Sequence, residues 1–476
     1  MKNYLSAINI AVWSIFIFFI STDYLYEKLT HMTTANIFPA LALHLGIGTP
    51  YDNFWDIYPP GIYFFYYFVD FLTEDLIINY IYLHLAILYF TILLSYKIFE
   101  VLKAPRFLFY IGLLVFISPA YINFLLPNDL IAYMFSNLGL FLYLYTKNNF
   151  SKYFLSNFFL VFAILIKETL LLSSASLLIF LIFKKYKPHI FFSILGGCSA
   201  VLVVLLFSIL NGFLSSTLEV YFVKYELFNI NKTLYYTLVF SAVVIFSIKF
   251  LFNYFKDKLK LMIFKFFNTK EIIVLIHSFL ILFSLFLDSK ESNGHYGIPK
   301  IFPILFIFTL FFQKFKLNKQ RVLSLFILIY FIFDISNIFK SYTEINLNSK
   351  AQEHNYLNLD SQTIQELKNS PSEILYLYGW GSTSFYYELK IIPYSRFWIV
   401  HPNIMLKAQK DELVNNLNKK LPKYIYYCGL NKNCFVDFDY EKFEIETYNF
   451  FKLVKNCYDE IDFNLYKKNE NLCVKN

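Results

Sequence analysis

Long apolar runs occupy most of the chain between residues 4 and 340. A helix needs about 20 mainly apolar residues to cross the roughly 30 Å hydrocarbon layer of a bilayer. About eleven runs reach or approach that length, at residues 4–21, 76–98, 104–122, 129–146, 153–166, 169–184, 189–213, 235–254, 271–288, 301–314 and 321–340. The pattern predicts an α-helical polytopic membrane protein. The first run reads as a retained helix, because no small-residue cleavage site follows it.

Basic residues gather in every second connection between these runs. They are Lys97, Lys103, Arg106, Lys147, Lys152, Lys184, Lys185, Lys187, Lys256, Lys258, Lys260, Lys265, Lys270, Lys314, Lys316, Lys319 and Arg321. Cytoplasmic loops carry an excess of Lys and Arg, so the remaining connections are expected to face outward. The sequence thus predicts a multi-pass protein of the inner (plasma) membrane. Its first loop, residues 22–75, and everything after about residue 341 are expected to be extracytoplasmic.

The C-terminal region has a different character. Charged and amide residues are interspersed after residue 341, and no run there is long enough to span a bilayer. Strand-like stretches at 373–378 and 423–427 flank a helical pattern at about 404–419. We therefore expect two domains, a transmembrane domain over 1–340 and a small extracytoplasmic α/β domain over 341–476.

Composition agrees with this division and narrows the choice of partners. Hydrophobic residues make up 57% of the chain and charged residues 16%, with a mean hydropathy of +0.49, whereas soluble domains carry about 25% charged residues. The net charge of +8 could suggest a nucleic-acid partner. The basic residues lie in short loops between apolar runs and do not cluster on a soluble face, so no nucleic-acid partner is expected.

The first loop contains the most informative stretch, TPYDNFWDIYPPGIYFF, which runs from residue 49 to 65. If the segment is helical, Asp52 and Asp56 sit one turn apart with Trp55 between them, and the Pro-Pro-Gly sequence then forces a turn. Carboxylates on a rigid turn at the bilayer surface suit proton abstraction from a sugar or lipid hydroxyl. The alternative is an amphipathic surface helix with solvated acids and an interfacial Trp.

This stretch resembles the first-loop motif of membrane glycosyltransferases of the GT-C fold, in which a G-x-P-Y-x-D-F-W-D-x-Y-P-P-G type string precedes a juxtamembrane helix. The family includes bacterial relatives of protein O-mannosyltransferases and of the aminoarabinose transferase that modifies lipid A. Further matching pieces follow in the family's order: PNDLIAYMFSNLGLFLYL, AILIKETLLL, GHYGIPKIFPIL, YLYGWGSTSFYYELKIIPYSRFW and LPKYIYY. The resemblance covers most of the chain.

The resemblance implies transfer of a sugar, with inversion, from a polyprenyl-phosphate donor to a protein, lipid A or glycan acceptor on the outer face. Asp56 matches the second Asp of D-F-W-D, while Asn53 replaces the first and Asp52 is displaced by one position. The family often places acidic residues about 15 positions before the loop glycine, where this chain reads HMTTANIFP. The general base therefore stays open among Asp56, Asp52, Asp23 and Glu27.

Other positions acquire candidate roles from the same resemblance. Asp129 matches an acidic residue that could order the first loop or support a divalent metal, or it could be a helix N-cap. Lys167 lies at the tip of a tight hairpin and could hold the donor phosphate, or it could form an internal pair with Glu168. His295, Tyr296 and Lys300 match a loop that could neutralise the phosphate leaving group, or they form an ordinary polar loop. His277, on an apolar helix face, is expected to be a packing residue.

Four cysteines lie in the C-terminal region: Cys428, Cys434, Cys457 and Cys473. None is spaced as in a C-x-x-C zinc motif, and an even number outside the cytoplasm favours disulfides. Sequence alone leaves three pairings open. We predict Cys428 with Cys434, across a turn-rich loop, and Cys457 with Cys473.

Two other classes of function compete with the transferase. A lipid-linked glycan flippase or other transporter predicts related halves and polar residues at mid-membrane. The polar groups of this chain are expected at the outer surface, and no halves are visible, so the enzyme is favoured. A polysaccharide polymerase or ligase is a closer competitor, because it would share lipid-linked substrates and an outward-facing site.

Overall fold

The structure of the protein is a computed structural model. The described residues are 8–15, 34–54, 59–69, 76–104, 106, 108–110, 113, 127–167, 170–184, 187–219, 267–288, 297–314, 359–377, 385–386, 389–397, 407–427, 444–445, 448–462 and 465–472.

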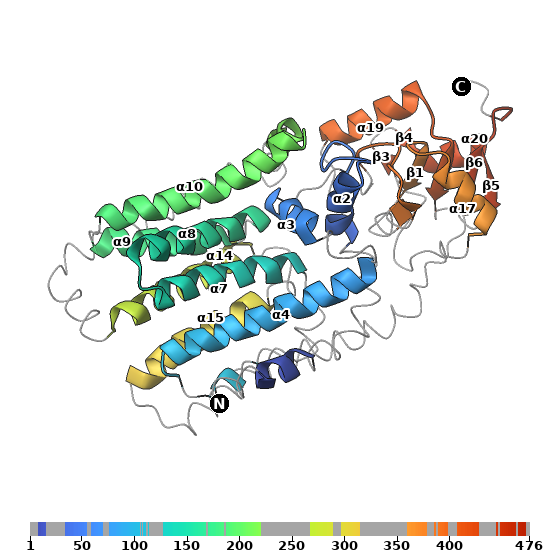
Figure 1. The fold of residues 1–476 in the computed structure, drawn as a ribbon. Coiled ribbons are helices and arrows are strands. Elements are labelled where there is room, and N and C mark those ends of the chain that lie inside the picture. Colours follow the sequence, from blue (N-terminus) through green and yellow to red (C-terminus); the bar gives the residue numbers. More distant parts are fainter. Residues whose placement is uncertain are drawn as a thin grey trace.

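Apolar helices packed side by side form most of the described structure (Figure 1). They are α4 (Leu76–Val101), α7 (Pro127–Tyr145), α8 (Asn149–Ile166), α9 (Leu171–Lys184), α10 (Lys187–Leu210), α14 (Thr269–Asp288) and α15 (Gly297–Lys314). Helix α8 packs against α7 and α10, α4 against α7, and α14 against α9 and α15. Among the described residues, three helical segments are long and apolar enough to cross a membrane: Leu83–Val101, Asn149–Ile166 and Pro188–Leu210. Each matches an expected span, while the runs at 235–254 and 321–340 lie outside the described residues.

The two shortest expected spans are longer in the structure. Helix α8 begins at Asn149, because the side chain of Asn148 caps it and accepts hydrogen bonds from the amides of Phe150 and Ser151. Helix α15 begins at Gly297, four residues before the expected start. In both cases the residues just before the apolar run form the first helical turn, residues 149–152 in α8 and residues 297–300 in α15.

Close backbone contact joins α8 to α10. A Cβ atom on Gly196 would lie 2.1 Å from the carbonyl oxygen of Phe154, so any residue other than glycine would clash there. One turn away, the Asn157 amide donates to the carbonyl oxygen of Ser193 at 2.8 Å. Small residues allow such approach between apolar helices, and side-chain hydrogen bonds strengthen it.

Buried polar groups also lie inside the bundle, so the expectation that polar groups belong to the outer surface is wrong for the described helices. His277 on α14 is buried, and its two ring nitrogens lie 3.3 Å from Ser136 Oγ on α7 and 3.2 Å from Ser176 Oγ on α9. Hydroxyls on neighbouring helices can both donate and accept, which makes this burial tolerable. His277 is thus buried among the helices with a hydroxyl beside each ring nitrogen, as expected of a packing residue.

The C-terminal region contains a four-stranded mixed sheet in the order β1-β2-β6-β5. Its strands are β1 (Ile374–Leu377), β2 (Tyr424–Tyr427), β5 (Tyr458–Asp462) and β6 (Leu465–Lys468), and its helices are α17 (Ser361–Lys368), α19 (Lys407–Lys419) and α20 (Phe450–Cys457). A separate pair joins β3 (Glu444–Ile445) to β4 (Tyr448–Asn449). Strands β1 and β2 are parallel, with α19 in the connection, as parallel neighbours require,. The expected strands and the helix between them are confirmed over 374–377, 424–427 and 407–419, and residues 378 and 404–406 lie outside the described residues.

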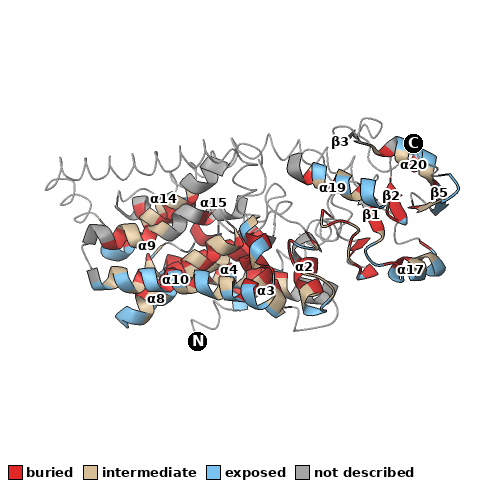
Figure 2. Ribbon diagram, turned by 90° about the horizontal axis from the view of Figure 1, so that it is seen from above, coloured by how far each residue is buried: buried red, intermediate tan, exposed pale blue. Residues whose placement is uncertain are grey.

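The sheet shares a hydrophobic cluster with the first loop. Phe38 and Ala42 of α2 (Thr34–His44) and Phe54 are buried together with Ile374, Tyr424, Tyr426 and Leu465 of the sheet. Helices α2 and α3 accordingly lie between the bundle and the sheet in both views (Figures 1 and 2). The candidate catalytic loop is therefore in contact with the C-terminal region as well as with the helices.

Cys457 at the end of α20 is disulfide-bonded, and Cys198 in α10 is free and exposed. The other three cysteines lie outside the described residues. The amide of Asn469 donates to the carbonyl oxygen of Cys457 at 2.9 Å, and Leu472 N donates to Asn469 O at 3.3 Å. The chain just before Cys473 thus folds back beside Cys457, which supports the expected pairing.

We predict that peptide mapping without reductant will recover a fragment linking Cys457 to Cys473. Loss of a bridge that closes so short a loop should lower the free energy of unfolding by about 2–3 kcal/mol, so Cys473→Ser should lower the melting temperature. Cys198→Ser is the control and should change neither result, because Cys198 is free. A fragment linking Cys457 to Cys428 or Cys434 would contradict the pairing.

Candidate active site

A closed turn from Thr49 to Phe54 forms the first of the two described parts of the first-loop motif. The amide of Tyr51 donates to the carbonyl oxygen of Phe54 at 3.0 Å, and the amide of Asn53 donates to that of Thr49 at 3.1 Å. The Asn53 side chain closes the turn by accepting from the amide of Thr49 at 2.8 Å. Tyr51 has a φ of 67°, in the left-handed region. The segment is therefore not helical at Asp52, and Asp56 lies outside the described residues.

Two aromatic side chains hold this turn in place. Tyr51 and Phe54 are fully buried, whereas Asp52 between them is exposed. The Tyr51 ring meets Tyr63 of α3 (Gly61–Val69) edge-on at 5.3 Å, and the Phe54 ring meets Phe38 at 4.9 Å. Burial of large aromatic side chains on both sides of the acid can offset the cost of the unusual φ. The consequence is a carboxylate presented on a fixed backbone.

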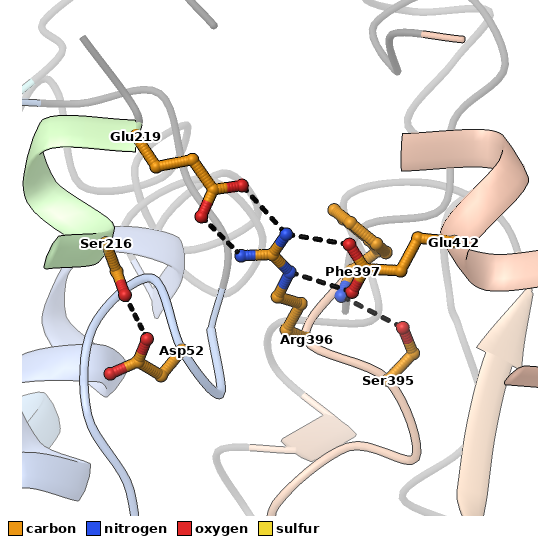
Figure 3. Close-up of polar contacts among 7 residues, drawn as sticks. All are labelled: Asp52, Ser216, Glu219, Ser395, Arg396, Phe397 and Glu412. Carbon is orange, nitrogen blue, oxygen red and sulfur yellow. Dashed lines mark hydrogen bonds and ion pairs between the residues drawn. The ribbon is translucent and has the colours of Figure 1, made fainter. Parts of the chain in front are cut away.

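Two hydroxyl groups donate to the Asp52 carboxylate. Thr49 Oγ1 donates to Asp52 Oδ2 at 3.1 Å, and Ser216 Oγ donates to Asp52 Oδ1. Ser216 is buried and belongs to the short helix at residues 214–219, just beyond α10 (Figure 3). The turn is thus joined to the end of the bundle at which α10 ends.

The Pro-Pro-Gly sequence joins the first loop to the helical bundle. The amide of Ile62 donates to Pro59 O at 3.2 Å, which confirms the expected turn. Helix α3 starts at Gly61, where a Cβ atom would lie only 2.4 Å from the carbonyl oxygen of Leu165 near the end of α8. Within the same helix, the Tyr66 hydroxyl donates to Asn128 Oδ1, at the start of α7, at 3.4 Å.

Lys167 lies two residues after Leu165, the residue of α8 that lies next to Gly61. It is the C-cap of α8, its amide donates to Ala163 O at 3.0 Å, and its carbonyl oxygen accepts from Leu170 N at 3.3 Å. Helix α9 starts at Leu171, so the expected tight hairpin is confirmed. Since Leu165 touches Gly61, Lys167 and the first loop lie at the same end of the bundle.

Asp129 and Lys300 are described only as positions along helices. Helix α7 begins at Pro127 rather than at Asp129, so the N-cap interpretation of Asp129 is wrong. Proline suits the first helical position, where its missing N–H would have no intrahelical partner, and Asp129 falls in the first turn. Lys300 likewise lies in the first turn of α15.

The remaining predicted site residues lie outside the described residues: Asp23, Trp55, Asp56, His295 and Tyr296. Among the side chains that the structure describes, no group of three or more His, Cys, Asp or Glu is placed to hold a metal ion. From the predicted set, the structure therefore places Asp52, Lys167 and the start of α7 at the same end of the bundle.

Arg396 is a residue that sequence reasoning did not single out. Its Nη1 and Nη2 atoms donate to both carboxylate oxygens of Glu219, at 3.0 and 2.9 Å. Its Nε and Nη2 atoms donate to both oxygens of Glu412 on α19, at 3.0 and 2.7 Å (Figure 3). Partial burial acts to lower the pKa of Arg396, and the hydrogen bonds from the two carboxylates outweigh it, so the pKa is raised. The only feature of the sequence that could have pointed to Arg396 is its place as the one charged residue in the aromatic run YSRFW.

Comparison with known proteins does not place the chain in a family. No protein-family model, curated protein or solved structure matches it.

The opposite end of the bundle carries basic residues. The hydroxyl of Tyr145 donates to the carbonyl oxygen of Lys97 at 3.2 Å, where α7 and α4 end. Lys152 Nζ lies 4.4 Å from the centre of the Tyr143 ring, and His189 at the start of α10 stacks on Tyr153 at 4.3 Å. Lys97 and Lys152, which come from two of the basic connections, therefore lie at the end away from the first loop.

The arrangement suits acid–base chemistry beside an anion. A carboxylate on a fixed turn can accept a proton from a hydroxyl, and a half-buried lysine at the same end can attract a phosphate.

Proposed function

We propose that the chain is a membrane glycosyltransferase of GT-C type. It moves a sugar from a polyprenyl-phosphate donor to a protein, lipid A or glycan acceptor on the extracytoplasmic face. The observation that carries the proposal is the contact between Gly61 and Leu165, which joins the acidic first loop to the helix end that bears Lys167. The basic residues at the other end support the outward orientation of this site and of residues 341–476.

In the proposed reaction, a first-loop carboxylate removes the proton of the acceptor hydroxyl. The acceptor oxygen then attacks the anomeric carbon from the side opposite the phosphate, so the configuration inverts as the bond to the phosphate oxygen breaks. Polyprenyl phosphate leaves with the electron pair. A cation near it contributes an attraction of about 332/(εr) kcal/mol, which grows as the site excludes water. Asp56 is the first candidate for the base, ahead of Asp52 and Asp23.

Purified protein should be incubated with polyprenyl-phosphate sugars and with candidate acceptors. The expected result is release of polyprenyl phosphate together with a glycosylated acceptor of inverted anomeric configuration. Donor consumption without a new glycosidic bond, or growth of a polysaccharide from a diphosphate-linked donor, would contradict the proposal and favour the polymerase alternative.

One observation favours a transporter as the second candidate. His277 with Ser136 and Ser176 forms the kind of buried polar cluster that lies on substrate or proton pathways,. Both ring nitrogens are, however, within hydrogen-bond range of a serine, which also fits a structural role. Counterflow of a lipid-linked sugar in proteoliposomes that is lost in His277→Leu would support transport.

Neutralising Lys167 is expected to weaken donor binding. Lys167→Met removes the positive charge beside the first loop, so the donor KM should rise about tenfold while the acceptor KM stays unchanged. Lys167→Arg keeps the charge and is the matched control, with a much smaller change. Steady-state kinetics with varied donor decides the matter. If both variants are degraded before they insert, Lys167 has a structural role such as a pair with Glu168.

A further inference from the structure

Arg396 links the C-terminal region to the end of the bundle through two carboxylates. Its bonds to Glu219 and Glu412 use four of the five N–H donors of a guanidinium,. The side chain of Arg396 is 20% exposed, against 42% for Glu219 and 38% for Glu412. Bidentate bonds of this kind fix orientation as well as distance. The link spans 177 residues of sequence between Arg396 and Glu219.

The link continues from Glu219 to the first loop. Glu219 and Ser216 lie three positions apart in the helix at 214–219, so they share one face of it. Ser216 donates to Asp52 in the turn of the first loop. Figure 3 shows Arg396, Glu219, Ser216 and Asp52 in this order across three segments of the chain. A shift of the guanidinium would therefore be passed to the turn through one short helix.

A second contact, which is apolar, also joins the first-loop turn to the C-terminal region. Phe54, at the end of the same turn, is buried in the cluster that includes Tyr424 and Tyr426 of the sheet. Apolar burial gives adhesion but little directional preference, whereas the bonds of Arg396 are directional. The apolar contact therefore attaches the turn to the C-terminal region, and the bonds of Arg396 orient it.

We infer that Arg396 is a positioning residue, which fixes the first-loop turn against the C-terminal region through Glu219 and Ser216. The inference rests on the proposed function only where the turn is said to serve catalysis. The guanidinium is engaged by two carboxylates, so its role is distinct from that of a cation that binds the donor phosphate. Lysine cannot replace it, since an ammonium group lacks the planar fork that serves two carboxylates at once.

The test compares Arg396→Met and Arg396→Lys with Lys420→Met in the full-length protein. Lys420 forms an exposed ion pair with Glu373 in the same region, at 2.8 Å, and its loss should have little effect. Hydrogen exchange is measured at the amides of Thr49, of residues 51–53 and of residues 214–219. Both Arg396 variants should speed exchange there by about tenfold or more, while Lys420→Met should match the wild type.

Kinetics supplies the second readout. Misplacement of a reacting group by about 1 Å can cost about 100-fold in rate, so both Arg396 variants should lower kcat by about 10- to 100-fold with an unchanged donor KM. A rise in donor KM alone would assign Arg396 to phosphate binding and overturn the inference, as would wild-type exchange at the turn in either variant. If the wild type transfers no sugar, the proposed function fails, and the exchange data still decide the positioning role.

Discussion

Asp56→Asn is expected to reduce sugar transfer by about 10²- to 10⁴-fold, the usual contribution of a general base. Asparagine keeps the volume of the side chain but cannot accept the proton of an acceptor hydroxyl. The loss should appear in kcat, with the donor KM little changed, because the proton moves only in the transition state. Release of polyprenyl phosphate from the purified protein is the measurement.

Asp52→Asn provides the comparison for this result. The Asp52 carboxylate accepts hydrogen bonds from Thr49 and Ser216, which indicates a role in holding the turn. An amide oxygen can keep one of these bonds, so the expected loss is smaller than at Asp56. Wild-type kcat in Asp56→Asn would contradict the assignment of the base, and Asp52 and Asp23 would become the leading candidates.

Local pattern predicted much of the architecture. The strands β1 and β2 were visible as short aromatic and aliphatic runs between polar segments, and the helices as long apolar runs, because burial on folding demands these patterns. Boundaries were less accurate where a cap residue decides them. Asn148 extends α8 by a turn, and Pro127 moves the start of α7 ahead of Asp129.

Long-range contacts account for what the pattern missed. The turn at Thr49 to Phe54 depends on Tyr51 and Phe54 finding aromatic partners from other segments, and no local signal marks Tyr51 for a positive φ. The link from Arg396 to Glu219 joins two positions that only the folded chain brings together. Lys167, in contrast, was predicted at a hairpin tip because two apolar runs meet there with almost no spacer.

Gly61→Ala is expected to uncouple the first loop from the bundle. The added Cβ would lie 2.4 Å from Leu165 O and 2.6 Å from Leu165 C, which are backbone atoms and cannot rotate aside. Helix α3 would have to move by about 1 Å to restore ordinary contact. Forced overpacking of this kind usually costs about 1–3 kcal/mol of stability. A displacement of that size in the loop that carries the acids should lower kcat by about 100-fold.

Gly46→Asn is the matched control, in the same loop region. Gly46 has a φ of +68° and no atom within 4 Å of an added Cβ, and asparagine tolerates left-handed backbone better than most residues. Its melting temperature and kcat should stay close to those of the wild type. Thermal unfolding and steady-state kinetics of the two variants separate the effects of packing and of loop mutation. If Gly61→Ala unfolds at the wild-type temperature and keeps its kcat, α3 does not press on α8, and the link between the acidic loop and Lys167 is broken.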